Sequence, residues 1–190
     1  VYPDTNYVWY WKKSASATDV RRADQTWWHK LITDRGYRMC RNNSFSGSTV
    51  CNTGYKGLDY TDRSFIARMK NLGNPDIIYI FGGTNDSWAG VPVGEFKYDD
   101  WTKEDLYKFR PAMAYMLSSM QEYYPGVEIV VLINNGLSYE VTQSSIDICD
   151  HYGVDYILLA DIDRIEGHPS VKGMQQIVDQ INAHDSARLK

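Results

Sequence analysis

The fold of this chain is decided by the stretch Asp76-Ile77-Ile78-Tyr79-Ile80-Phe81-Gly82-Gly83-Thr84-Asn85-Asp86. Its first part is an apolar and aromatic run rich in β-branched residues, which predicts a strand buried on both faces, as in the interior of a parallel sheet. The two glycines that follow allow the backbone to turn sharply at the carboxyl end of this strand. Because open α/β sheets bind ligands just beyond that end, Asn85 is expected to lie in a functional crevice.

Helical and strand patterns alternate along the rest of the chain. Helices are expected over 24–34, 62–72, 102–124, 138–152 and 170–182, and strands over 37–42, 77–81, 128–133 and 155–159. This alternation predicts an α/β fold, a three-layer α/β/α sandwich with a mainly parallel, flavodoxin-like central sheet. The aromatic segment 1–11 and the excursion from Ser87 to Trp101 are too irregular for regular elements, and a loop as long as this excursion is usually functional or mobile.

Composition narrows the class of protein. The chain has 190 residues and 43% hydrophobic residues, which fits one domain over 1–190 with a good core. A net charge of -4, without any long cluster of Lys and Arg, argues against a nucleic-acid partner. No apolar run approaches the roughly 20 residues that a membrane span needs, so no membrane partner is expected. Fifteen Tyr and six Trp predict either a broad binding groove or extensive aromatic packing.

The cysteines point to no metal site. Cys40, Cys51 and Cys149 lack the paired CxxC spacing of a structural zinc centre, and no metal or cofactor is expected. Cys40 and Cys51 could close a loop in an exported protein, which would leave Cys149 unpaired. The alternative is three buried thiols.

Three candidate site residues follow different expected strands. Gly47 lies in the Ser/Asn/Gly-rich loop after the first, Asn85 follows the second, and His168 lies shortly after the last. Residues from neighbouring strand ends converge on one crevice, which favours a catalytic site. Each also has a structural interpretation: Gly47 as a turn residue, Asn85 as a cap of the next turn, and His168 as a surface histidine before a helix. The other three histidines, His29, His151 and His184, fit surface or packing positions in or beside helices.

These residues stand in blocks that resemble the SGNH (GDSL-like) hydrolase family of esterases and acylhydrolases. Residues 43–49, Asn-Ser-Phe-Ser-Gly-Ser-Thr, resemble the block with the oxyanion glycine, and residues 82–86, Gly-Gly-Thr-Asn-Asp, resemble the block with the oxyanion asparagine. Residues 167–170, Gly-His-Pro-Ser, resemble the terminal histidine block. The likeness covers nearly the whole chain. It implies catalytic roles for Gly47, Asn85 and His168.

Two features depart from the family pattern. The resemblance implies a nucleophilic serine in a Gly-Asp-Ser block that follows a first, central strand, and it places that block before Val1. The family acid usually stands three residues before the histidine, where this chain has Ile165. Asp163, Glu166 and a backbone carbonyl are the alternatives for the partner of His168, and we favour Asp163.

The resemblance implies a serine esterase that removes small acyl groups, acetyl above all, from carbohydrate. Trp88, Tyr98 and Trp101 are the expected substrate-binding residues because sugar rings stack on exposed aromatic side chains. Segments 1–11 and 88–101 would wall the groove. The alternative function is a glycan-binding module without a nucleophile. Export from the cytoplasm is expected from the resemblance.

Overall fold

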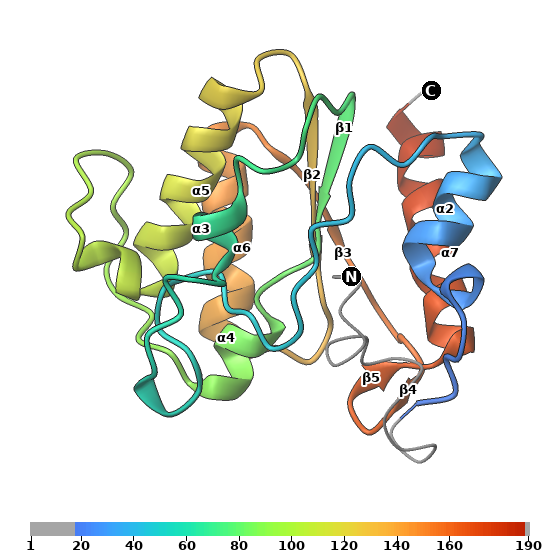
Figure 1. Ribbon diagram of the computed structural model, residues 1–190, viewed down its shortest axis with the longest axis horizontal. Coiled ribbons are helices and arrows are strands. Elements are labelled where there is room, and N and C mark those ends of the chain that lie inside the picture. Colours follow the sequence, from blue (N-terminus) through green and yellow to red (C-terminus); the bar gives the residue numbers. More distant parts are fainter. Residues whose placement is uncertain (1–17, 189–190) are drawn as a thin grey trace. The chain divides into compact units, whose positions relative to one another are not determined.

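The computed structural model describes residues 18–188, so the aromatic segment 1–11 lies outside the described part. The chain divides into two compact units (Figure 1). One is Gly47–Leu158, and the other combines Val1–Ser46 with Leu159–Lys190. Each unit is described by itself.

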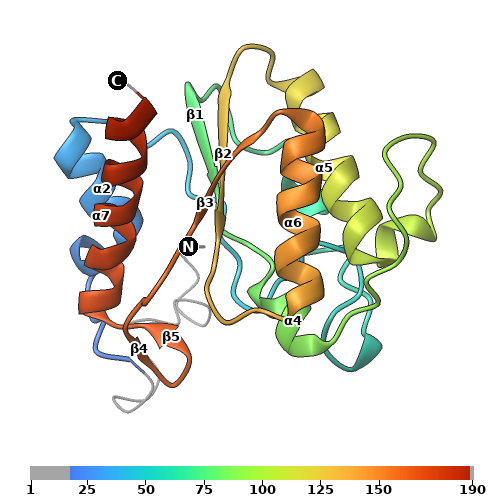
Figure 2. The same cartoon turned by 180° about the vertical axis from the view of Figure 1, so that it is seen from behind.

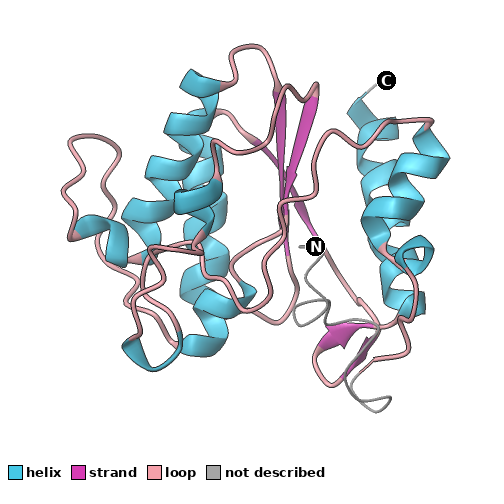
Figure 3. Cartoon of the chain, in the orientation of Figure 1, coloured by secondary structure: helices cyan, strands magenta, loops and turns pink. Residues whose placement is uncertain are grey.

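The unit 47–158 is built on a parallel sheet. Its strands β1 (Ile77–Ile80), β2 (Glu128–Ile133) and β3 (Asp155–Leu158) pair in the order β1-β2-β3 (Figure 3). All three were predicted from the sequence, and the α/β fold class is confirmed. The prediction of complete burial is wrong for β1, in which buried and half-buried residues alternate, and it fits the central strand β2 instead.

Four helices belong to the same unit: α3 (Phe65–Arg68), α4 (Thr84–Ala89), α5 (Phe109–Tyr123) and α6 (Tyr139–Tyr152). Two views show α5 and α6 side by side on one face of the sheet (Figures 1 and 2). Apolar residues of β2 and both helices form the buried core there, among them Val131, Leu117 and Ile148. Burial of these side chains provides the main driving force for this layer. Short 3-10 helices, η2 (Tyr55–Gly57) and η3 (Asp105–Tyr107), lie in the connections.

The second unit contains η1 (Ala23–Gln25), α2 (Trp27–Arg35), β4 (Arg164–Ile165), β5 (His168–Pro169) and α7 (Val171–Arg188). Helices α2 and α7 pack together (Figure 2). Arg35 joins them by donating to the side chains of Asn182 and Asp185, both at 2.8 Å. The hairpin β4–β5 was not predicted, because two-residue strands are too short to produce a periodic pattern.

The structure corrects four other expectations. Residues 37–42 form no strand: all but the half-buried Asn42 are exposed, and no strand among residues 18–188 pairs with them. The helix expected over 62–72 is shorter and consists of α3 alone. Leu72 lies beyond its end, and its N–H donates to the Tyr124 hydroxyl. The excursion after Asn85 begins with the regular helix α4. The described residues form no disulfide; Cys51 and Cys149 are buried thiols, whereas Cys40 is exposed.

Candidate active site

Asn85 is held where β1 passes into α4. Gly83 precedes the helix with φ +84°, a left-handed conformation that a glycine adopts without strain. A Cβ on Gly82 would lie 3.0 Å from the Phe65 ring and 3.4 Å from Val50, so glycine allows this turn to approach the neighbouring loop closely. The Gly-Gly pair therefore brings Asn85 against the segment that begins at Gly47.

The side-chain amide of Asn85 is fixed at both ends. Its Nδ2 donates to the backbone oxygen of Ser48 at 3.0 Å, and its Oδ1 accepts from the hydroxyl of Tyr55 at 2.8 Å. Since a carbonyl oxygen can only accept, the contact with Ser48 determines which end of the amide carries the nitrogen. This contact uses one Nδ2 hydrogen, and the amide carries a second one that can donate.

Asp86, on α4, connects this helix to the loop that begins at Gly47. Its carboxylate is buried, with 1% relative exposure, and accepts the N–H of Val50 at 3.0 and 2.8 Å and that of Cys51 at 3.3 Å. Burial raises the pKa of Asp86 from 3.8 to about 6, and the backbone hydrogen bonds oppose this shift. The carboxylate fixes the position of the loop that contains Gly47 relative to α4.

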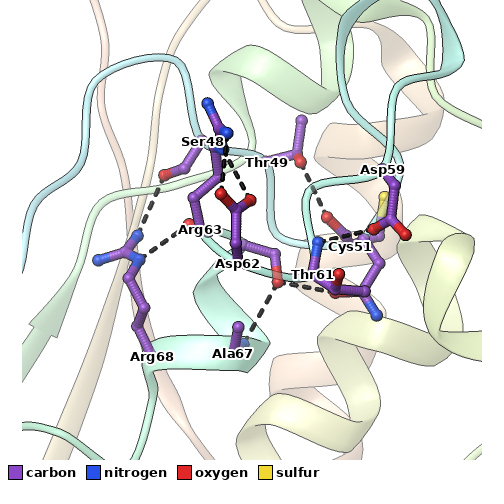
Figure 4. A network of polar contacts seen from close by, with 11 residues as sticks. Ser48, Thr49, Cys51, Asp59, Thr61, Asp62, Arg63, Ala67 and Arg68 are labelled. Carbon is purple, nitrogen blue, oxygen red and sulfur yellow. Dashed lines mark hydrogen bonds and ion pairs between the residues drawn. The ribbon is translucent and has the colours of Figure 1, made fainter.

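A second polar group supports the same loop from α3. The Arg68 guanidinium is buried and donates to the Ser48 hydroxyl at 3.1 Å and to the backbone oxygen of Arg63 at 2.8 Å, as Figure 4 shows. Gly47 itself has φ +76°, and a Cβ there would meet no atom within 4 Å. Glycine is therefore favoured at this position by backbone conformation and not by lack of space.

His168 lies at the start of β5, in the other compact unit. The turn between β4 and β5 is Glu166–Gly167, with φ +48° and +78°, the sign pattern of a type I′ hairpin. This turn folds the backbone oxygen of Glu166 onto Nδ1 of His168 at 3.0 Å. A carbonyl can only accept, so this contact places the proton on Nδ1 and leaves Nε2 as the basic nitrogen.

Asp163, the favoured acid, makes a different set of contacts. Its carboxylate accepts the Ser170 hydroxyl, and its backbone oxygen accepts the Ser170 N–H at 3.0 Å. Ser170 Oγ also accepts the N–H of Gly173 at 3.0 Å, as an N-cap of α7 does. Asp163 thus fixes the junction between the hairpin and α7. The Nδ1 atom of His168 instead contacts the Glu166 backbone oxygen. A backbone carbonyl was the third alternative considered from the sequence, after Asp163 and Glu166.

The three expected substrate-binding aromatic residues lie in different environments. Trp88, on α4, has 49% exposure, whereas the half-buried Trp101 donates its indole N–H to the Lys97 oxygen at 2.9 Å and packs against Tyr115. Tyr98 stacks on His151 at 3.7 Å, near the end of α6. The start of α6 adjoins α4 through a Ser138–Ser87 hydrogen bond, so its end lies about 20 Å away along the helix. Of the three, Trp88 is the one that shares a helix with Asn85.

Other site types find no support among the described residues. Within 18–188, no group of three or more His, Cys, Asp or Glu side chains could hold a metal ion. No helix in the same range is long and apolar enough to cross a bilayer.

Sequence reasoning missed two residues around Asn85: Tyr55, and Asp86 in its structural role. The adjacency of Asp86 to Asn85 was visible, but its bonding partners lie more than 30 residues away in the chain.

The structure defines an α/β protein with a fixed side-chain amide beyond the carboxyl end of β1, and comparison with known families gives its class. Residues 1–184 match the family GDSL-like lipase/acylhydrolase. The chain belongs to this family. Among curated proteins, none matches it.

Solved structures give the same assignment. A protein of Bacteroides ovatus described as a GDSL-like lipase is 57% identical, with a TM-score of 0.94 over 98% of this chain and 90% of that one. One from Bacteroides uniformis with the same description is 53% identical, with a TM-score of 0.89 over 92% of this chain and 81% of that one. A family two carbohydrate esterase of Clostridium thermocellum, in complex with cellohexaose, shares the fold at 16% identity, with a TM-score of 0.56 over 93% of this chain and 58% of that one.

Proposed function

We propose that the protein is a serine esterase that hydrolyses small acyl esters, acetyl above all, on carbohydrate. The observation that carries the proposal is the fixed Asn85 amide beside the Gly47 loop. A preorganised neutral donor at that position stabilises the oxyanion that develops during acyl transfer, and it does so without attracting a ground-state anion. The family to which the chain belongs supports the reaction class.

The mechanism has two half-reactions. His168 Nε2 removes the proton from a serine hydroxyl, which attacks the ester carbonyl carbon and forms a C–O bond. The negative oxygen accepts hydrogen bonds from Asn85 Nδ2 and the Gly47 N–H. When the intermediate collapses, the C–O bond to the alcohol breaks and His168 returns the proton to that alcohol. Water then repeats the sequence on the acyl-enzyme. The serine is that of the Gly-Asp-Ser block expected before Val1.

The partner of His168 in this proposal is the Glu166 backbone oxygen. A carbonyl holds the imidazole in the tautomer whose proton is on Nδ1 and whose Nε2 is the base, which is the orienting role of the aspartate in a Ser-His-Asp triad. It carries only a partial charge, so it stabilises the imidazolium less than a carboxylate does. The proposal therefore replaces the sequence-based preference for Asp163, whose carboxylate accepts the Ser170 hydroxyl.

The carbohydrate part of the proposal depends on Trp88. Sugar rings stack on exposed aromatic faces, whereas a long acyl chain needs a continuous apolar trench. Trp88 is exposed, and it stands on the same short helix as Asn85. Export from the cytoplasm stays a prediction from the family resemblance.

The test uses the full-length protein, including whatever residues precede Val1. We expect hydrolysis of p-nitrophenyl acetate and of acetylated xylan, and little hydrolysis of esters with long acyl chains. His168→Ala should abolish turnover, and Asn85→Ala should lower kcat about 10²- to 10³-fold with folding intact. His151→Ala, which changes a histidine at the far end of α6, is the matched control and should retain activity.

Three results would contradict the proposal in whole or in part. Cleavage of long-chain esters alone would remove the carbohydrate assignment. Full activity of Asn85→Ala would remove Asn85 from the oxyanion hole. Binding of xylan without any turnover by the full-length protein would instead favour the glycan-binding module, the second function considered from the sequence.

A further inference from the structure

The Asn85 amide has a partner that the catalytic blocks do not include. Tyr55 belongs to the 3-10 helix η2, 30 positions before Asn85 in the chain, and its hydroxyl donates to Asn85 Oδ1 at 2.8 Å. A hydroxyl alone can either donate or accept. Here the Ser48 backbone oxygen fixes Nδ2 on its own side, so the Tyr55 hydroxyl must face Oδ1 and must donate.

The loop that contains Tyr55 is held by backbone hydrogen bonds and close packing. The Gly54 N–H donates to the Leu58 oxygen at 2.7 Å, and the Leu58 N–H donates back to the Tyr55 oxygen at 3.2 Å. Lys56, between them, adopts a left-handed φ of +57°, which is uncommon for a residue with a side chain. A Cβ on Gly54 would lie 2.4 Å from the Tyr60 ring, so only glycine fits there. The loop therefore holds the Tyr55 ring in a defined position.

The Tyr55 hydroxyl also stays protonated at neutral pH. Burial, followed by the nearby Tyr60 and Asp86, raises the pKa of Tyr55 above its ordinary value of 10.0. A protonated hydroxyl that donates to an amide oxygen withdraws electron density from the amide. This makes the N–H a stronger donor, because hydrogen bonds in a chain polarise one another.

We propose that Tyr55 is a positioning residue for the oxyanion hole: its hydroxyl locks the orientation of the Asn85 amide and strengthens the Nδ2–H that faces the reacting oxygen. Tyr55 does not touch the substrate in this role. It acts only through Asn85. The proposal rests on the function proposed above, since it assigns Asn85 as an oxyanion donor. Without the lock, an amide that rotates about χ2 would present Oδ1 and repel the developing negative charge.

The test is a double-mutant cycle in the full-length enzyme with p-nitrophenyl acetate. Tyr55→Phe removes the hydroxyl and keeps the ring, and we expect kcat to fall about 5- to 30-fold while KM stays within about 2-fold, because the lock acts in the transition state. In the Asn85→Ala background the same substitution should change kcat less than about 2-fold, because the amide that it orients is absent. Thermal unfolding of each variant verifies that it is folded.

Tyr107→Phe is the matched control. Its hydroxyl donates to Asp59 of the same loop at 3.2 Å but does not contact Asn85, so its loss should leave kcat within about 2-fold. An equal fall in kcat for Tyr55→Phe in both backgrounds would show that the hydroxyl acts independently of Asn85 and would overturn the inference. An unchanged kcat for Tyr55→Phe in the otherwise wild-type enzyme would also overturn the inference. Full activity of Asn85→Ala would contradict the proposed function itself, which is a distinguishable outcome.

Discussion

The Asp86 carboxylate accepts the backbone N–H of Val50 through both of its oxygens, at 3.0 and 2.8 Å, across 36 positions of the chain. This contact ties the loop that begins at Gly47 to the helix that carries Asn85. The two proposed oxyanion donors, Gly47 and Asn85, are thereby held by one buried carboxylate. The acidic residue that directly follows Asn85 therefore has a structural role in joining the loop to the helix.

Asp86→Asn should lower kcat about 10-fold and leave KM nearly unchanged. The asparagine amide offers one acceptor oxygen, and its NH2 group would oppose an N–H that the carboxylate now accepts, so the loop must shift. Steady-state kinetics with p-nitrophenyl acetate measures the effect. Asp62→Asn, at an exposed ion pair with Arg63, is the control and should retain activity. Wild-type kcat in Asp86→Asn would contradict the anchoring role.

The same carboxylate predicts a pH dependence of stability. The pKa of Asp86 is raised from 3.8 to about 6 in the folded state, so folding favours its protonated form. The contribution to stability is fully present below about pH 4 and is lost as the pH rises through about 6. At about 1.4 kcal/mol per pKa unit, the loss amounts to about 3 kcal/mol at most.

Urea denaturation at several pH values between 4 and 7 measures this loss. We expect the free energy of unfolding of the wild type to fall relative to that of Asp86→Asn over this range, because the variant lacks the titrating group. Parallel pH curves for the two proteins would show that the Asp86 pKa is not raised.

Substitutions at the hairpin distinguish the three candidate partners of His168. Glu166→Gln should leave kcat within about 2-fold, because the backbone oxygen that accepts from Nδ1 is retained. Asp163→Asn should lower the melting temperature and reduce kcat less than about 10-fold, since it weakens the contact with Ser170. Loss of an acid that orients the histidine would cost about 10⁴-fold in kcat. A fall of that size in either variant would assign its carboxylate as the acid.

Trp88→Ala should raise KM for acetylated xylan several-fold and leave the kinetics with p-nitrophenyl acetate unchanged. The reason is that the small ester has no sugar ring to stack on the indole. Tyr123→Ala removes an exposed aromatic side chain at the end of α5 and serves as the control. If both substrates were affected equally, Trp88 would support the site structurally and would not contact the sugar.

Sequence reasoning succeeded where the signal is local. The strand β2 and the helix α6 match their predicted ranges closely, because continuous apolar runs and Ser138 or Gly153 at the helix ends carry their own information. It failed for residues 37–42, whose weak alternation resembles a strand but has no partner in the described structure. It also missed the hairpin β4–β5, which consists of little more than a turn.

By itself, the amino-acid sequence determined the α/β class, the parallel strands and the candidates Gly47, Asn85 and His168, because strand patterns and turn residues act over a few positions. Only the tertiary structure decided which groups support them: Asp86 and Tyr55 around the Asn85 loop, and the Glu166 backbone oxygen beside His168. The first two contacts join residues 30 or more positions apart. The third depends on a two-residue turn, so packing and backbone geometry, and not residue type, select these partners.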